Sequence, residues 1–183
     1  MKRRNFLKSA ASALPLAITQ PFVLAMETPT ASAEEHVVLA SQDRFGEARS
    51  LGFSHIAFKT ATADTDGNLF VIEHSNLMPG GPPMHLHLMQ EEWFYVEEGE
   101  VLIQVGEKRV HLKAGDSVLA PRTVPHAFTA VGEKPAKMLI AFSPAGKMEQ
   151  FFIDAGKLKG GAMQGPEFYA KYEMKLVGQP LKA

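Results

Sequence analysis

The sequence contains no cysteine, so disulfide bonds, thiolate metal ligands and cysteine nucleophiles are all excluded. It also lacks the long apolar run that a membrane span requires, and its formal net charge of -1 gives no electrostatic reason to expect nucleic acid as a partner. The 183 residues, 45% of them hydrophobic, are enough to fill the core of one domain. Any metal ion bound by this chain must therefore be held by nitrogen and oxygen ligands.

The first 33 residues have the features of an export signal. Arg3 and Arg4 are followed by Asn-Phe-Leu-Lys, a modest apolar stretch over residues 10–25, and then Ala31-Ser32-Ala33. This order resembles a twin-arginine signal peptide, whose small-residue triplet is the pattern that signal peptidases cut. The resemblance implies recognition by the twin-arginine export machinery, cleavage after Ala33, and a periplasmic or secreted protein. The alternatives are a chance basic and apolar N-terminus or a retained membrane anchor.

From residue 51 onward, short alternating or apolar runs broken by turn residues predict an antiparallel sandwich or barrel. Helical periodicity appears only in residues 146–158 and 166–174. We therefore predict an N-terminal arm over residues 34–50, an all-β barrel over 51–145 and a short helical tail over 146–183. Tight turns are expected at Asp66-Gly67, Glu98-Gly99, Gly106-Glu107, Gly115-Asp116 and Gly132-Glu133.

Two imidazoles are predicted to share one face of a strand. Residues two apart along a strand point the same way, so His85 and His87 can both face one cavity. Glu92 follows five residues later. Its carboxylate joins the imidazoles if its strand turns Phe94 inward and Trp93 outward.

His126 is the expected fourth member, brought in from a non-adjacent strand after a turn that Pro121 and Pro125 stiffen. Three neutral imidazoles and one carboxylate form a site of intermediate hardness, which suits Mn, Fe, Ni, Cu or Zn and leaves positions open for water, oxygen or substrate. The predicted metal ligands are His85, His87, Glu92 and His126.

These residues resemble the two motifs of the cupins, a family of small double-sheet jelly rolls. The first motif is matched by His85-Leu86-His87, then four residues, Glu92, six residues and Gly99; the second is matched by Gly115, Pro121 and His126. Three positions depart from the motifs: Gly80 is one residue too close to His85, Thr123 replaces the usual glycine, and Ala130 replaces the usual asparagine.

The resemblance covers about residues 53–142, and its finer likeness is to bacterial single-domain cupins related to quercetin dioxygenases. It implies a double-stranded β-helix, pairing into a homodimer, and a metal-dependent, dioxygenase-like oxidoreductase acting on a small enolic or phenolic substrate, with Glu92 as the base. An isomerase, epimerase or decarboxylase would use the same metal site. A cupin that binds a small ligand without catalysis is the remaining alternative.

The export signal bears on which metal is bound. Nitrogen and oxygen ligands prefer Cu(II) and Zn(II) by intrinsic affinity. Twin-arginine substrates are exported folded, as the resemblance implies, so the metal would be acquired in the cytoplasm. Mn or Fe is therefore the favoured ion.

The other histidines, Glu91 and four apolar residues are interpreted as structural. His36, His55, His74 and His111 are interpreted as hydrogen-bonded core residues, and Glu91 as a solvated neighbour or a partner of an imidazole. The apolar residues Phe94, Phe128, Ile140 and Phe142 are interpreted first as core, although the same residues could line the cavity.

Overall fold

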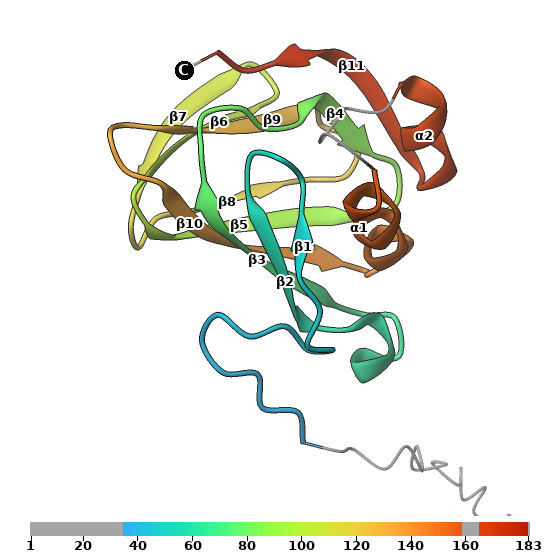
Figure 1. The fold of residues 1–183 in the computed structure, drawn as a ribbon. Helices are drawn as coiled ribbons and strands as arrows, with labels where there is room; N and C mark the ends of the chain where they lie inside the picture. The colour runs from blue at the N-terminus through green and yellow to red at the C-terminus, as the bar shows by residue number, and fades with distance from the viewer. Residues whose placement is uncertain (1–34, 159–164, 183) are drawn as a thin grey trace, which may run out of the picture. The chain divides into compact units, whose positions relative to one another are not determined.

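The computed structural model describes residues 35–158 and 165–182 (Figure 1). The predicted signal peptide and its cleavage site lie outside these ranges. Within them, no helix is long and apolar enough to cross a membrane. The chain forms antiparallel strands in two sheets, followed by two short helices and a last strand. The prediction of an all-β jelly roll with helices near its C-terminus is confirmed.

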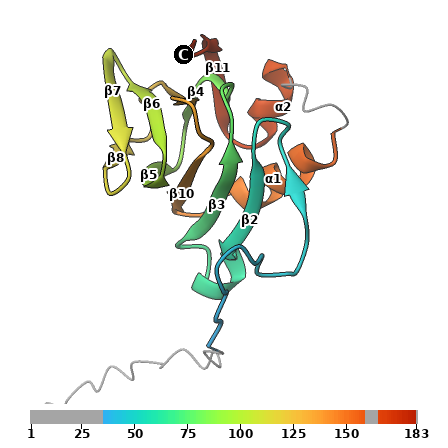
Figure 2. The ribbon, with the colours of Figure 1, turned by 60° about the vertical axis from the view of Figure 1, so that its left-hand side comes forward.

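The strands are divided between a six-stranded and a five-stranded sheet (Figures 1 and 2). The first contains, in spatial order, β1 (Arg49–Ser50), β2 (His55–Thr60), β3 (Phe70–Leu77), β10 (Ala136–Ser143), β5 (Glu91–Glu98) and β8 (Ser117–Ala120). The second contains β11 (Met174–Pro180), β4 (Pro83–His87), β9 (His126–Val131), β6 (Glu100–Val105) and β7 (Lys108–Lys113). From β3 onward the chain passes repeatedly from one sheet to the other, so segments distant in sequence face one another across the core.

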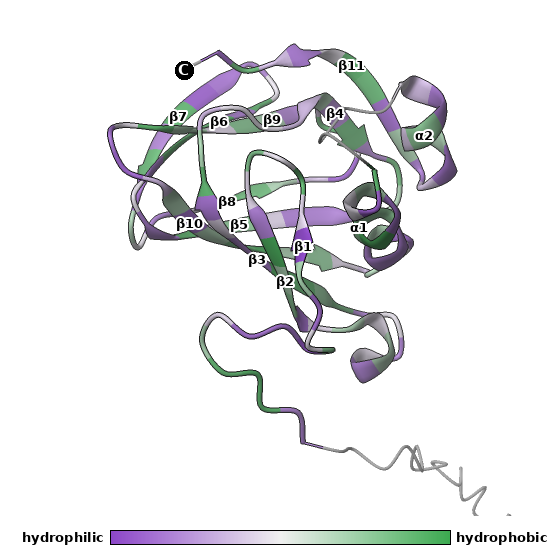
Figure 3. Cartoon of the chain, viewed as in Figure 1, coloured by the Kyte–Doolittle hydropathy of each residue, from purple (hydrophilic) through white to green (hydrophobic). Residues whose placement is uncertain are grey.

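Alternation along the strands determines which side chains enter this core (Figure 3). On β5, Phe94 and Val96 are fully buried, whereas Trp93 is 38% exposed and stacks on Tyr95 on the outer face. The predicted orientation of this strand is therefore correct. It also turns Glu92, which is 3% exposed, toward the interior.

Turn glycines fix the connections that the strand register depends on. Gly99 joins β5 to β6 with φ of 72°, and a Cβ there would lie 2.9 Å from the Cα of Ala136. Gly81 precedes β4 with φ of 120°, and a Cβ there would lie 2.1 Å from the backbone oxygen of Phe128. Only glycine accommodates both the backbone conformation and the close approach to β9.

The C-terminal segment contains a strand as well as two helices. α1 (Met148–Gly156) and α2 (Pro166–Lys171) lie beside each other at one end of the sheets in both ribbon views. β11 then pairs antiparallel with β4, opposing Met174 to His87 and Leu176 to His85. The sequence interpretation assigned only helices to this segment, because a single edge strand after two helices carries little periodic signal. β11 thus supports the strand that carries two predicted ligands.

Candidate metal centre

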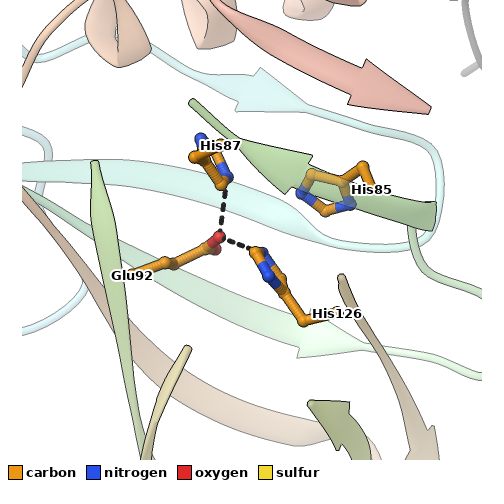
Figure 4. A group of neighbouring side chains, drawn as sticks. All are labelled: His85, His87, Glu92 and His126. Carbon is orange, nitrogen blue, oxygen red and sulfur yellow. Dashed lines mark hydrogen bonds and ion pairs between the residues drawn. The ribbon is translucent and has the colours of Figure 1, made fainter. Parts of the chain in front are cut away.

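Four side chains converge between the two sheets (Figure 4). His85 and His87 lie on β4, His126 opens β9 directly opposite His85, and Glu92 projects from β5 in the other sheet. Their donor atoms all lie within 4.8 Å of one another, and all four residues are buried. The predicted convergence is therefore present, and it depends on a chain crossing from β4 to β5 within three residues.

Backbone carbonyls orient two of the imidazoles. His85 Nδ1 lies 2.8 Å from the carbonyl oxygen of Pro83, and His126 Nδ1 lies 2.9 Å from that of Val124. A carbonyl can only accept, so each Nδ1 carries the hydrogen and donates it. Each Nε2 is left as the nitrogen available to the centre of the cluster, which is the arrangement found around histidine metal ligands.

Glu92 balances the charge of this cluster. Its Oε2 accepts a hydrogen bond from His126 Nε2 at 2.7 Å, and His87 Nε2 lies 2.9 Å from the same oxygen but outside hydrogen-bond geometry. Burial alone raises the pKa of Glu92, but the adjacent His126 and His87 outweigh burial and hold it well below its ordinary value. Burial likewise lowers the pKa of His126, and Glu92 outweighs burial and raises it.

The resulting protonation pattern is compatible with a cation at the centre of the cluster. Both nitrogens of His126 donate, so this ring is an imidazolium that shares its Nε2 proton with Glu92. Burial, reinforced by His126 and His87, lowers the pKa of His85 to about 3, so this ring stays neutral as a metal ligand must. An ion at the centre would take the place of the Nε2 proton of His126.

The unpartnered ring nitrogens of His87 indicate that these residues fit a metal ion. Neither of its ring nitrogens has a hydrogen-bond partner among the described residues, although the side chain is 1% exposed. Buried polar atoms without partners are rare because they lose their hydration without replacement. Ligands on opposite sides of an ion with bonds of about 2.1 Å lie roughly 4 Å apart, close to the spread of these donors. The donor set fits a transition-metal ion, which would satisfy Nε2.

The cluster borders a cavity of about 70 Å³. Apart from His85, His87, Glu92 and His74, the lining is apolar or aromatic. Strands contribute Phe128, Ile140 and Phe142, and the segment before β2 contributes Phe53. The C-terminal segment contributes Met148, Phe151, Phe152, Ala155, Leu158, Phe168, Tyr169 and Met174. Of the four apolar residues interpreted as core, Phe128, Ile140 and Phe142 therefore also line the cavity, whereas Phe94 packs against the edge of the His126 ring.

The sequence interpretation missed the contribution of the C-terminal helices to the cavity. Met148, Phe151, Phe152 and Ala155 are spaced as one face of a helix, and this spacing was the available signal that α1 must cover an apolar surface. Which surface it covers is a tertiary property. Burial raises the pKa of Tyr169, whose ring lies 5.9 Å from that of His85, to about 12, so its hydroxyl stays protonated beside the cluster.

Three of the other histidine interpretations were wrong. His36, His55 and His111 lie at the surface, where His111 pairs with Glu100 at 2.8 Å. His55 alternates along β2 with the buried Ile56 and Phe58, so strand geometry turns it outward. His74 is buried as interpreted and is 1% exposed.

Glu91 contacts no imidazole. Both its carboxylate oxygens accept from Arg122, at 2.5 and 2.6 Å, and this pairing lowers the pKa of Glu91. The pair fixes the start of β5 to the turn before His126. In the same turn Thr123 has φ of 65°, which explains why the cupin motif favours glycine there, and its N–H donates to the His87 carbonyl at 2.7 Å.

This part of the chain is similar to known proteins. The family model for the cupin domain matches residues 74–142, which include the whole cluster. An RmlC-like cupin from Shewanella frigidimarina has the same fold, with a TM-score of 0.51 at 24% identity, covering 61% of this chain and 93% of that one.

Two curated relatives from fungi are similar over shorter stretches. Oxidoreductase iacF of Pestalotiopsis fici is 34% identical over 98 residues, which cover 45% of this chain and 48% of that protein. Epoxidase atD of Aspergillus terreus is 40% identical over 53 residues, which cover 29% of this chain and 17% of that protein. The chain thus spans about half or less of the length of the curated relatives it matches.

Proposed function

We propose that the protein is a metal-dependent oxidoreductase, dioxygenase-like in type, that acts on a small enolic or phenolic substrate. The observation that carries this proposal is the buried set of three imidazoles and one carboxylate bordering an apolar cavity. Such a set binds a transition metal while leaving coordination positions open toward the cavity. The names of the fungal oxidoreductase and epoxidase support redox chemistry over isomerisation or decarboxylation.

The metal ion, Glu92 and the cavity lining would have different roles in the reaction. A divalent metal ion, when bound, polarises a substrate oxygen and stabilises the negative charge that develops on it. Glu92 is ionised at neutral pH, as a proton acceptor must be, and lines the cavity, which supports a role in accepting the enolic or phenolic proton. The aromatic lining excludes water and favours a flat apolar substrate, and the cavity volume of about 70 Å³ favours a small one.

We also propose that the protein is exported folded and acquires Mn or Fe before export. The support is the Arg3-Arg4 motif and the small-residue triplet ending at Ala33, together with a donor set that would otherwise select copper or zinc. Rerouting the protein through an export pathway for unfolded chains should change the metal that is recovered. Unchanged metal content would contradict early loading. A homodimer remains our expectation for the mature protein, and analytical ultracentrifugation tests it.

The central experiment combines metal analysis with oxygen uptake. Protein purified from its own export route should contain about one equivalent of metal and consume oxygen with enolisable ketones or phenols. Glu92→Gln should lose most of the bound metal and the activity. Glu91→Gln is the matched control, because it changes an adjacent carboxylate that contacts only Arg122. It should retain both.

The outcomes separate the candidate functions. Stoichiometric metal without oxygen uptake, but with conversion of a substrate, would favour an isomerase, epimerase or decarboxylase. Bound metal and bound ligand without any conversion would favour a binding protein. Equal metal contents in Glu92→Gln and Glu91→Gln would refute the assignment of Glu92 as a ligand.

A further inference from the structure

The cavity contains one imidazole that the metal cluster does not use. His74 on β3 lines the cavity but is not among the converging donors, and its side chain is almost completely buried. Its Nδ1 lies 2.9 Å from the Oγ of Ser54 in the segment before β2. No hydrogen bond within the described residues uses its Nε2. A buried imidazole with one engaged nitrogen therefore presents its other nitrogen to a mostly apolar space.

Ser54 determines which nitrogen carries the hydrogen. The hydroxyl of Ser54 has Nδ1 of His74 as its hydrogen-bond partner, and the described residues provide no other acceptor for it. If Nδ1 donated, the hydroxyl hydrogen would be buried without an acceptor, because Ser54 is 3% exposed. The satisfied arrangement has Ser54 donating to Nδ1, so the hydrogen of the neutral ring lies on Nε2.

The surroundings keep this ring neutral and fixed. Phe53 stacks parallel to it at 6.4 Å with an interplanar angle of 8°, and Phe128 and Phe152 meet it edge-on at 5.6 and 6.2 Å. Burial lowers the pKa of His74 to about 4, only partly opposed by the charge of Glu92. At neutral pH the cavity therefore contains a preorganised, uncharged N–H donor.

We propose that His74 Nε2–H binds an oxygen atom of the substrate, and that Ser54 acts as the positioning residue that fixes this tautomer. The ligand class is a small, flat, mostly apolar molecule with a hydrogen-bond-accepting oxygen, such as a short enolisable ketone. A charged or strongly hydrated ligand does not match one neutral donor among aromatic rings. This inference rests on the proposed function only in taking the cavity as the substrate site.

A matched pair of probes isolates the hydrogen bond. Acetone and isobutene have the same shape, are small enough for the cavity, and differ in whether C=O or C=CH₂ is present. Metal-loaded protein should bind acetone roughly fivefold more tightly, the effect expected of one neutral hydrogen bond. His74→Phe fills a similar volume within an aromatic cluster and should abolish the preference while keeping the metal content. His74→Gln, which restores an N–H donor, should recover part of it.

The metal-free protein separates this donor from the metal. A preference that persists after the metal is removed and is lost in metal-free His74→Phe belongs to His74, whereas one that disappears with the metal would assign the ketone oxygen to the ion and overturn the proposal. An undiminished preference in folded His74→Phe would overturn it as well. Failure of the proposed oxidoreductase function gives a different result, namely no oxygen uptake with the ketone preference intact.

A measurement on the wild-type protein avoids dependence on any variant. In ¹⁵N-labelled protein, the Nε2–H proton of His74 should move downfield when acetone is added and should respond much less to isobutene. Ser54→Ala should weaken this signal, because the tautomer is then no longer fixed. Equal responses to both probes, or a hydrogen found on Nδ1, would refute the assignment.

Discussion

Replacing His87 with leucine should stabilise the metal-free protein, because a buried imidazole without hydrogen-bond partners is poorly suited to the core. The two ring nitrogens of His87 are buried without hydrogen-bond partners, and each such atom costs about 1–3 kcal/mol. The substitution also loses the stacking on His126 at 5.4 Å, the contact with Phe142 and an attraction to Glu92, together worth about 1–2 kcal/mol. At the midpoints of these ranges, about 4 kcal/mol is recovered and about 1.5 kcal/mol is lost, so the expected net gain is about 2–3 kcal/mol.

Urea unfolding in the presence of a chelator measures this gain. When the measurement is repeated with metal, the wild type should be more stable than His87→Leu. A ligand present at about 1,000 times its dissociation constant adds about 4 kcal/mol to the wild-type free energy of unfolding. His87→Leu, which lacks one donor, should gain little from the same metal. A metal-free variant several kcal/mol less stable than the wild type, or equal stabilisation of both proteins by metal, would refute the reasoning.

Further predictions concern acid stability and two backbone positions. In the unfolded chain His74 takes up a proton below about pH 6.5, whereas in the folded protein it does so only near its pKa of about 4. The free energy of unfolding therefore decreases as the pH falls from about 6.5 to about 4. In urea unfolding, His74→Phe should remove about 3 kcal/mol of that decrease. Gly81→Ala should cost about 3 kcal/mol or more by denaturation, because its Cβ would meet the Phe128 oxygen. Gly67→Ala, which also has a positive φ but open space around the added Cβ, should cost about 1 kcal/mol. Thr123→Gly should raise the free energy of unfolding by about 1 kcal/mol by relieving a positive φ at an exposed position. Similar costs for the two alanine variants, a destabilised Thr123→Gly, or an unchanged pH dependence would each contradict the corresponding argument.

The strand pattern shows which features of the fold the local sequence predicts. The five predicted turns all connect consecutive strands, and the alternation around Glu92 correctly separated its buried neighbours from Trp93. The same alternation rule places His74 on the face of Phe70 and Ile72, and His55 on the opposite face from Ile56. Treating these histidines alike ignored that rule, which is why one of the two interpretations was wrong.

The sequence by itself determined the jelly roll and the four candidate ligands, because hydrophobic alternation, turn glycines and the spacing of His85, His87 and Glu92 are local properties. Only the tertiary structure decided that α1 and α2 line the cavity, that Ser54 fixes the tautomer of His74, and that His126 shares its proton with Glu92. These features depend on contacts between residues 20 or more positions apart. No local pattern encodes such distances, since they follow from how the two sheets and the C-terminal segment pack together.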